Sequence, residues 1–261
     1  MTFESLRAEL DRWSALGRRA TFWWRDDDAA ADTPALRRLA SYADSHDAPL
    51  GLAVIPAKLA DDAARVIAAC RTCAVLQHGY AHRNHAPPVE KRCELGAHRA
   101  LHDVADELSR GRRALQATFG AKFVPVLVPP WNRIAADVVS ALPALGYRGL
   151  STFGPRRTRT PLPGLVQCNT HVDVIAWRDG RSFVGDDDAA ALLAGHLESR
   201  RESHVDPDEP TGLLTHHFDF DDAAWRFVER LLAFTRVHAA VEWVAPSVAF
   251  GLAPAGATSV R

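Results

Sequence analysis

Short apolar runs alternate with amphipathic segments along nearly the whole chain, and this alternation limits its fold more than any other feature. Strand-like runs separated by helical patterns form parallel βαβ units. Seven or eight such units in a chain of 261 residues favour a (β/α) barrel, whose chemistry lies where the strands end. The predicted strands are Ala20–Trp24, Leu50–Ile55, Ala74–Gln77, Phe123–Val128, Tyr147–Thr152, Leu165–Asn169, Gly212–Thr215 and Val241–Val244. The predicted helices are 3–16, Pro34 to about Asp44, 59–69, 97–118, 135–145, 187–203 and 221–238.

The composition favours a single folded domain that binds neither nucleic acid nor a charged membrane surface. The chain is 47% hydrophobic, and no linker or long repeat divides it, so we predict a single domain over 1–261, with its core at about 20–245. Lys plus Arg number 31 and Asp plus Glu 32, so no overall field attracts nucleic acid or a membrane surface. The first residues include Glu4, Glu9 and Asp11 without a continuous apolar stretch. This start predicts neither a signal peptide nor a membrane span, and it favours a cytoplasmic location.

The cysteines do not indicate a disulfide scaffold, because the chain has only four. Cys70 and Cys73 form a CxxC pair, which we interpret as ordinary half-buried thiols. Half of a zinc site or a redox pair is the alternative.

Three acidic runs compete as candidate sites. Two of them, Asp186–Asp188 and the group Asp219, Asp221 and Asp222, open helical patterns, where carboxylates cap free N–H groups and complement the helix dipole. The third run, Asp26–Asp28, follows the strand-like TFWW, and the next helix already has its own cap at Asp32 or Thr33. Three adjacent carboxylates repel one another, so a bound metal or a protonated partner is expected there.

A histidine pair follows the strand that ends at Gln77. His78 and His82 are four residues apart, so one helical turn would direct both imidazoles at a single point. Two imidazoles and a carboxylate leave zinc an open position for water, which is the pattern of a catalytic zinc site. The neighbouring Asn84 and His85 are candidates to touch substrate or to orient a ligand.

Two further motifs follow strands. In LVPPWNR, residues 127–133, the prolines stiffen a loop that can hold the backbone N–H of Trp131 in one direction. In TGLLTHHFDF, residues 211–220, an apolar run delivers His216 and His217 to a strand end. Four of the seven tryptophans lie near predicted strand ends and could stack on sugars, although core packing is the favoured role for any single one. These four are Trp23, Trp24, Trp131 and Trp177.

The order of these motifs resembles the polysaccharide deacetylase (NodB-homology, carbohydrate esterase) family over roughly residues 20–240. The resemblance implies a distorted (β/α) barrel of about seven parallel strands. It also implies a divalent metal, commonly Zn²⁺, and the hydrolysis of an N-acetyl or related acyl group, usually on an amino sugar.

The resemblance also implies a role for each matching residue. The adjacent Asp pair supplies a general base and then a metal ligand, and we favour Asp26 as base and Asp27 as ligand over the shifted pair Asp27 and Asp28. The other metal ligands are then His78 and His82. The Trp131 N–H helps to hold the oxyanion, and His216 is the general acid.

Two family features are not matched in the sequence. The Arg that orients the catalytic Asp is replaced by Val128, for which Arg25 or Arg133 could substitute. The Asp and Trp that tune the catalytic His are not matched cleanly, because Asp173 and Trp177 have a different spacing.

The sequence therefore predicts a metal-dependent hydrolase of an acylated sugar or small molecule. The alternatives are hydrolysis of another C–N bond on a non-sugar substrate, and a silent domain that kept the metal ligands and lost the Arg.

Overall fold

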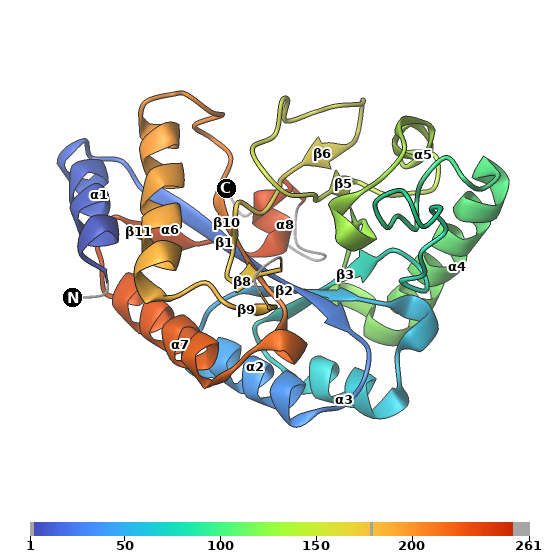
Figure 1. The fold of residues 1–261 in the computed structure, drawn as a ribbon, viewed down its shortest axis with the longest axis horizontal. Helices are drawn as coiled ribbons and strands as arrows, with labels where there is room; N and C mark the ends of the chain where they lie inside the picture. Colours follow the sequence, from blue (N-terminus) through green and yellow to red (C-terminus); the bar gives the residue numbers. More distant parts are fainter. Residues whose placement is uncertain (1–2, 178–179, 253–261) are drawn as a thin grey trace, which may run out of the picture.

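The protein folds around a curled parallel sheet, as a computed structural model that describes residues 3–177 and 180–252 shows (Figure 1). The strand order is β6-β5-β4-β3-β2-β1-β10-β7, and β11 pairs with the opening residues of β1. The end strands β6 and β7 are not neighbours, so the described sheet forms an incomplete barrel, which confirms the predicted distorted (β/α) barrel. The strands are β1 (Ala20–Ala29), β2 (Leu50–Val54), β3 (Cys73–His78), β4 (Phe123–Val128), β5 (Gly149–Leu150), β6 (Val166–Gln167), β7 (Val172–Asp173), β10 (Thr211–Thr215) and β11 (Val241–Trp243).

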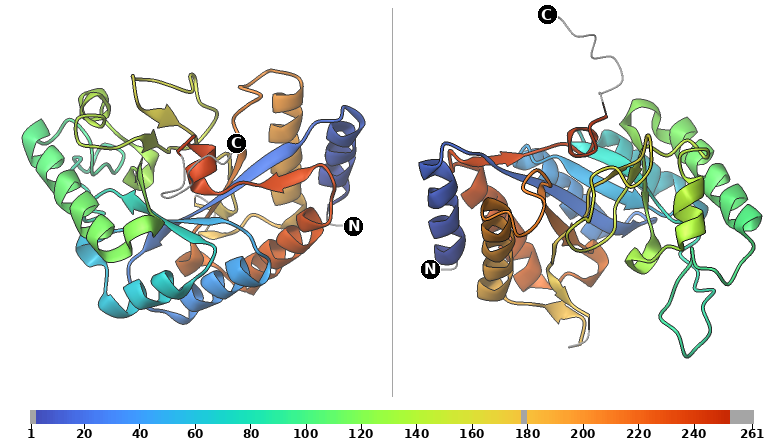
Figure 2. Two further views of the ribbon diagram at one scale, coloured as in Figure 1. Left: turned by 180° about the vertical axis from the view of Figure 1, so that it is seen from behind. Right: turned by 90° about the horizontal axis from the view of Figure 1, so that it is seen from above.

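Helices cover the outer side of the curled sheet (Figures 1 and 2). The N-terminal helix α1 packs against α6. A short antiparallel hairpin, β8 (Ile175–Ala176) with β9 (Ser182–Phe183), lies outside the main sheet. No helix among the described residues is long and apolar enough to cross a membrane. The α-helices are α1 (Glu4–Ala15), α2 (Pro34–Ser45), α3 (Asp61–Ala69), α4 (Leu101–Phe119), α5 (Ala136–Ala141), α6 (Asp186–Arg201), α7 (Asp222–Arg236) and α8 (Pro246–Ala249).

Helix ends follow the predicted capping residues at two positions. Thr33 accepts a hydrogen bond from Leu36 N–H and caps α2, and Asp221 accepts one from Ala224 N–H and caps α7. Asp186 to Asp188 lie inside the first turn of α6, so they complement its dipole but provide no side-chain cap.

The central strand β1 is longer than predicted and contains the acidic run. It pairs with β10 up to the register Asp26↔Thr215, and with β2 up to Ala29↔Val54. The carboxylates are tolerated in a buried strand because each has a polar partner there, as described below.

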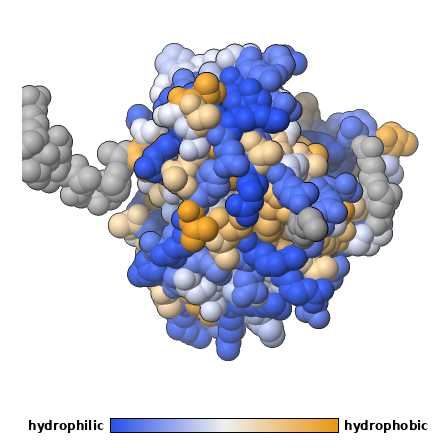
Figure 3. Space-filling view, turned by 90° about the vertical axis from the view of Figure 1, so that its left-hand side faces the viewer, coloured by the Kyte–Doolittle hydropathy of each residue, from blue (hydrophilic) through white to orange (hydrophobic). Residues whose placement is uncertain are grey.

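Two of the tryptophans that were candidates for stacking on sugars are buried in the core. Trp23 and Trp24 are fully buried, and their indole N–H groups donate to Asn169 O and Thr215 Oγ1. Both are therefore packing residues. On the outside, the face that carries α1 and α6 is mainly hydrophilic, with apolar side chains in small groups (Figure 3).

Cys70 and Cys73 form a disulfide between the end of α3 and the start of β3, so their interpretation as thiols was wrong. Both cysteines are buried. Helix α3 ends at Ala69, and the short turn between it and β3 brings the two sulfur atoms together. A disulfide is typical of oxidising compartments. It therefore weighs against the cytoplasmic location, which stays a prediction.

A buried histidine pair predicts a pH dependence of folding. The rings of His171 and His196 stack with centroids 3.7 Å apart, near Glu209 and Arg200. Burial lowers the pKa of His196 to about 2 and also lowers the pKa of His171. The unfolded chain therefore binds protons below about pH 6.5 that the native state rejects, so stability is full above that pH and falls as the pH drops.

We expect the free energy of unfolding to fall by up to about 1 kcal/mol for each histidine of the pair between pH 7 and pH 5.5, measured by urea denaturation. This range lies above ordinary carboxyl titration. In His196→Gln the slope should flatten. An unchanged slope in this variant would show that the pair does not cause the effect.

Candidate active site

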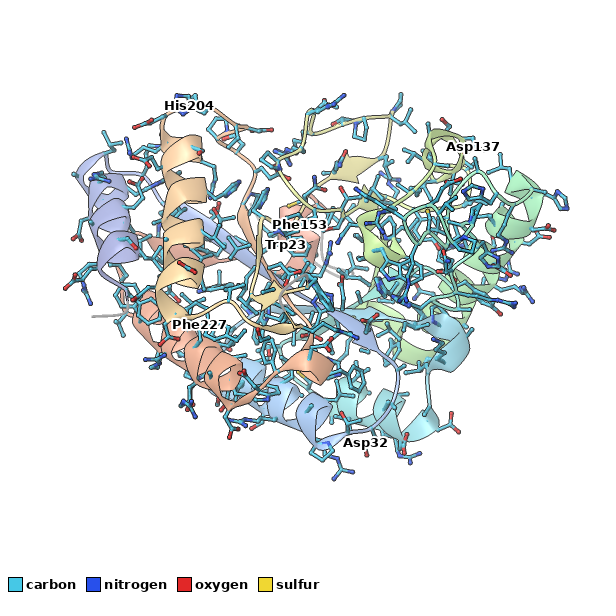
Figure 4. All side chains as sticks on the ribbon, viewed as in Figure 1. Trp23, Asp32, Asp137, Phe153, His204 and Phe227 are labelled. Atoms are coloured by element: carbon cyan, nitrogen blue, oxygen red, sulfur yellow. A yellow bond between two sulfur atoms is a disulfide. The ribbon has the colours of Figure 1, made fainter. Side chains whose placement is uncertain are left out.

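The candidate site lies at the carboxyl ends of β1, β3, β4 and β10. A pocket of about 860 Å³ opens there. One of its lining residues, Phe153, lies near the middle of the fold, whereas Asp32 and His204 lie at the periphery (Figure 4). The pocket is lined by Asp27, Asp28, His78, His82, Lys91, Arg92, Trp131, Asn132, Arg133, Phe153, Asp173, Trp177, Arg181 and His216.

The three carboxylates of β1 point in different directions. Strand alternation places Arg25 and Asp27 on one face and Asp26 on the other. Asp28 has a left-handed backbone (φ 73°), at a register shift between Asp26 and Ala29. This bulge redirects the Asp28 side chain, so that it lies in the same pocket as Asp27.

Asp28 is the carboxylate that meets the histidine pair. Its Oδ1 lies 3.2 Å from Nε2 of His78 and 3.2 Å from Nε2 of His82, and the ligand atoms of the three residues form a group that could hold a metal ion. The sequence favours Asp27 in this position. In the structure Asp28 groups with the two imidazoles, because the bulge at this position brings the third carboxylate to them. Which aspartate binds the metal stays a prediction.

The donor set fits a divalent cation. His78 Nδ1 lies 3.0 Å from the carbonyl oxygen of Val128, which can only accept, so Nδ1 carries a proton and Nε2 is the atom that would bind a metal. Asp28 Oδ1 is buried without a hydrogen-bond partner of good geometry. Burial opposes ionisation of Asp28, but the attraction of His78 and His82 outweighs it and holds the pKa of this carboxyl well below its ordinary value. A carboxylate oxygen and two imidazole nitrogens are ligands that Zn²⁺ and similar ions accept.

The two histidines are brought together by a bent loop. The predicted helical turn is absent: His78 ends β3, and His82 has a left-handed backbone (φ 51°). The buried Glu94 holds this loop by accepting hydrogen bonds from the N–H groups of Tyr80 and Ala81. Glu94 could not be singled out from the sequence, because this residue lies in a loop without strand or helix periodicity.

Asp27 forms a two-point ion pair with Arg25. Arg25 Nε lies 2.9 Å from Asp27 Oδ1, and its Nη2 donates to Asp27 Oδ2 at 3.0 Å. The guanidinium is fully buried and also donates to Ser151 Oγ and Asn132 Oδ1, which fix its plane. Arg25 therefore holds the Asp27 carboxylate in place, whereas no contact joins Arg133 to Asp27 among the described residues.

His216 lies between two carboxylates. Its Nε2 is 4.0 Å from Asp27 Oδ2, and its Nδ1 is 3.9 Å from Asp173 Oδ1. Trp177 donates to Asp173 Oδ2 at 2.6 Å, and its ring meets the His216 ring edge-on with centroids 4.6 Å apart. Burial raises the pKa of Asp173, although His216 and the Trp177 N–H favour its charged form. The Asp and Trp that the sequence spacing failed to match are thus placed beside the histidine by β7 and the β8–β9 hairpin.

Asp26, which the sequence favours as the general base, does not line the pocket. It is fully buried, its Oδ1 is 2.5 Å from His217 Nδ1, and its Oδ2 accepts from Thr215 Oγ1 and the His217 N–H. His217 is fully buried as well and does not line the pocket. The Asp26 carboxylate therefore links β1 to Thr215 at the end of β10 and to His217 just beyond it, inside the core.

Of the remaining candidate residues, two line the pocket and two lie outside it. Trp131 lines the pocket with a left-handed backbone (φ 56°), and its ring lies 4.4 Å from that of His82 between centroids. Arg133 also lines it. Asn84 Oδ1 accepts from the N–H groups of Ala86 and Cys93 and so shapes the loop, and neither Asn84 nor His85 lines the pocket.

Comparison with solved structures shows that the fold is that of the polysaccharide deacetylases. A Mycobacterium smegmatis protein assigned as a polysaccharide deacetylase superposes with a TM-score of 0.65 at 16% identity, over 93% of this chain and 94% of that one. A family 4 acetyl xylan esterase from Clostridium thermocellum, in complex with a cobalt ion, gives 0.56 at 11% identity, over 89% and 93%. A CE4 family pseudoenzyme from Bacillus anthracis gives 0.53 at 15% identity, over 83% and 60%. No protein-family profile and no curated protein sequence matches the chain.

Proposed function

We propose that this protein is a divergent member of the polysaccharide deacetylase family and a metal-dependent hydrolase that removes an N-acetyl or related acyl group from an amino sugar. One observation carries the proposal. A metal-type cluster of Asp28, His78 and His82 shares a single pocket with Asp27 and His216, at the strand ends of a fold that known deacetylases have.

The cation would be held by Asp28 Oδ1 and by Nε2 of both histidines. When bound, a divalent ion such as Zn²⁺ polarises an acyl oxygen and lowers the pKa of a coordinated water. The imidazole of His78 is already oriented for this role by its bond to Val128 O.

The other residues of the site can move protons and hold charge. Asp27, fixed by Arg25, takes the proton from the attacking water as general base. The N–H of Trp131 stabilises the developing oxyanion, a contribution typically of about 3 kcal/mol. His216, whose Nε2 lies 4.0 Å from Asp27 Oδ2, gives a proton to the departing amine as general acid.

The pairing of Arg25 with Asp27 supports an active enzyme over a silent domain. The silent alternative drew on the missing motif Arg at Val128, and pseudoenzymes do occur on this fold. Here a buried guanidinium reaches the carboxylate from the same strand, two residues away. The base is therefore oriented, as catalysis requires.

Acetate release from N-acetylglucosamine oligomers tests this function. We expect purified protein loaded with Zn²⁺ or Co²⁺ to release acetate, a chelator to abolish release, and added metal to restore it. His82→Ala, which removes one ligand, should bind metal weakly and lack activity. Activity that survives chelation would contradict the proposal, and metal binding without turnover across amide and ester substrates would support the silent domain. Turnover of small cyclic amides alone would favour the non-sugar alternative.

A further inference from the structure

Basic side chains line the pocket of the candidate site. Lys91 and Arg92 lie in the loop between β3 and α4, Arg133 follows β4, and Arg181 follows β8. Lys91, Arg92 and Arg181 are exposed, and Arg133 is half-buried. The β3–α4 loop and the β8–β9 hairpin project from the same side of the molecule (Figure 2, right).

Among the residues that the structure describes, three of these cations have no carboxylate partner. Arg181 pairs with Asp219 at 3.1 Å. Within the described residues, no acidic side chain lies within ion-pair distance of Lys91, Arg92 or Arg133. The guanidinium of Arg133 instead donates from Nη1 to the backbone oxygen of Arg92 at 2.8 Å.

The acidic side chains of the same pocket are already engaged. Asp27 is paired with Arg25, Asp28 lies against the two metal-type histidines, and Asp173 accepts from Trp177. They are also more buried than the exposed cations. The basic groups are thus left to face solvent and any ligand that enters.

The fold holds the unpaired cations close together. The loop of Arg92 is tied to the segment of Arg133 by a hydrogen bond from Ala135 N–H to Leu95 O, at 2.8 Å, and by a parallel bridge between Leu95 and Ile134. Like charges in one place repel, and within the described residues none of the three forms an ion pair with a carboxylate. A bound anion would remove this repulsion.

Two exposed aromatic rings complete the pocket. Phe153 is 47% exposed and Trp177 is 40% exposed, although large apolar side chains are normally buried. Both line the same pocket as the cations. Exposed aromatic surface inside a polar pocket suits the apolar face of a sugar ring.

We propose that the substrate is an N-acylated sugar that carries a phosphate group, with the phosphate bound by Lys91, Arg92 and Arg133 and the ring against Phe153 and Trp177. This inference rests on the proposed deacylase function. A phosphate carries up to two negative charges and several acceptor oxygens, which guanidinium groups can bind in a bidentate manner.

Substrate competition measures the preference. kcat/KM for acetate release is compared among N-acetylglucosamine, its 1-phosphate, its 6-phosphate and the carboxylate-bearing N-acetylmuramic acid. We expect at least one phosphate ester to exceed the neutral sugar by about tenfold or more, as charge-assisted hydrogen bonds would give. In the Arg92→Gln/Arg133→Gln double variant this preference should disappear, so that the ratio of kcat/KM for the phosphate ester to kcat/KM for the neutral sugar falls to about one. Arg113→Gln, which removes one Arg charge from the exposed face of α4, is the control and should behave as wild type.

Binding measured by calorimetry separates this inference from the proposed function. Asp27→Asn, which lacks the proposed base, is titrated with the same four sugars. Equal affinity and equal turnover for neutral and phosphorylated sugars would overturn the inference and leave the deacylase function intact. An equal preference for the carboxylate sugar would overturn the choice of phosphate. If no sugar is deacylated but the phosphate esters bind more tightly, and the double variant removes that difference, the deacylase proposal fails and the anion site stands.

Discussion

Asp27→Asn is expected to lower kcat for deacylation by about 10²- to 10⁴-fold, the usual contribution of a general base, while the protein keeps its metal. Asparagine preserves the shape of the side chain but cannot accept the proton from water. Asp27 lies beside the metal-type cluster and belongs to the pair with Arg25. Its loss should therefore leave the three ligand residues in place. Steady-state kinetics together with metal content by atomic absorption make the measurement.

Asp28→Asn is the matched control, because asparagine also tolerates the left-handed backbone at this position. We expect it to lose metal affinity by more than the roughly 10- to 100-fold that follows removal of an outer-shell partner. Its activity should return in part at high metal concentration, whereas that of Asp27→Asn should not. The reverse result, with metal lost in Asp27→Asn and kept in Asp28→Asn, would restore the arrangement that the sequence favoured.

The strand pattern predicted the fold well because parallel βαβ units leave a strong signal. The boundaries of β4 coincide with the predicted Phe123–Val128, and the N-terminus of α2 has the expected Thr33 cap. The two-residue strands β5 and β6 are shorter than predicted, and β7, β8 and β9 were missed. Segments this short carry too few alternating positions for periodicity to detect.

The sequence motifs predicted most residues of the candidate site, but not which of these residues contact one another. Among three identical adjacent side chains, no sequence feature indicates which one faces the histidine pair. In the structure it is Asp28, because a β-bulge with a left-handed residue at this position turns its side chain toward them. Arg25 and Asp27 share a strand face, so their pairing could have been read from period-2 alternation. Asp173 and Trp177 reach His216 through a separate hairpin, and a fixed spacing cannot anticipate that.

Asp26→Ala is expected to destabilise the fold by about 3–5 kcal/mol, as removal of one partner from a buried pair does. The substitution would leave His217 Nδ1, the Thr215 hydroxyl and the His217 N–H without their acceptor in a site that water does not reach. For a chain of this size the melting temperature should fall by roughly 6 to 20 °C. Thermal and urea denaturation of metal-free protein measure the effect, with Asp28→Asn, whose side chain is partly exposed, as the control.

The comparison with His217 decides whether Asp26 acts through structure or chemistry. If the two residues stabilise the fold as a pair, Asp26→Ala/His217→Ala should cost less than the two single variants added together, by about 0.5–3 kcal/mol. The folded fraction of Asp26→Ala at low temperature should then retain substantial kcat, because its side chain does not reach the pocket. A normal melting temperature combined with lost activity would instead make Asp26 the base. In that case the ion pair of Asp27 with the buried Arg25 would have a structural role only.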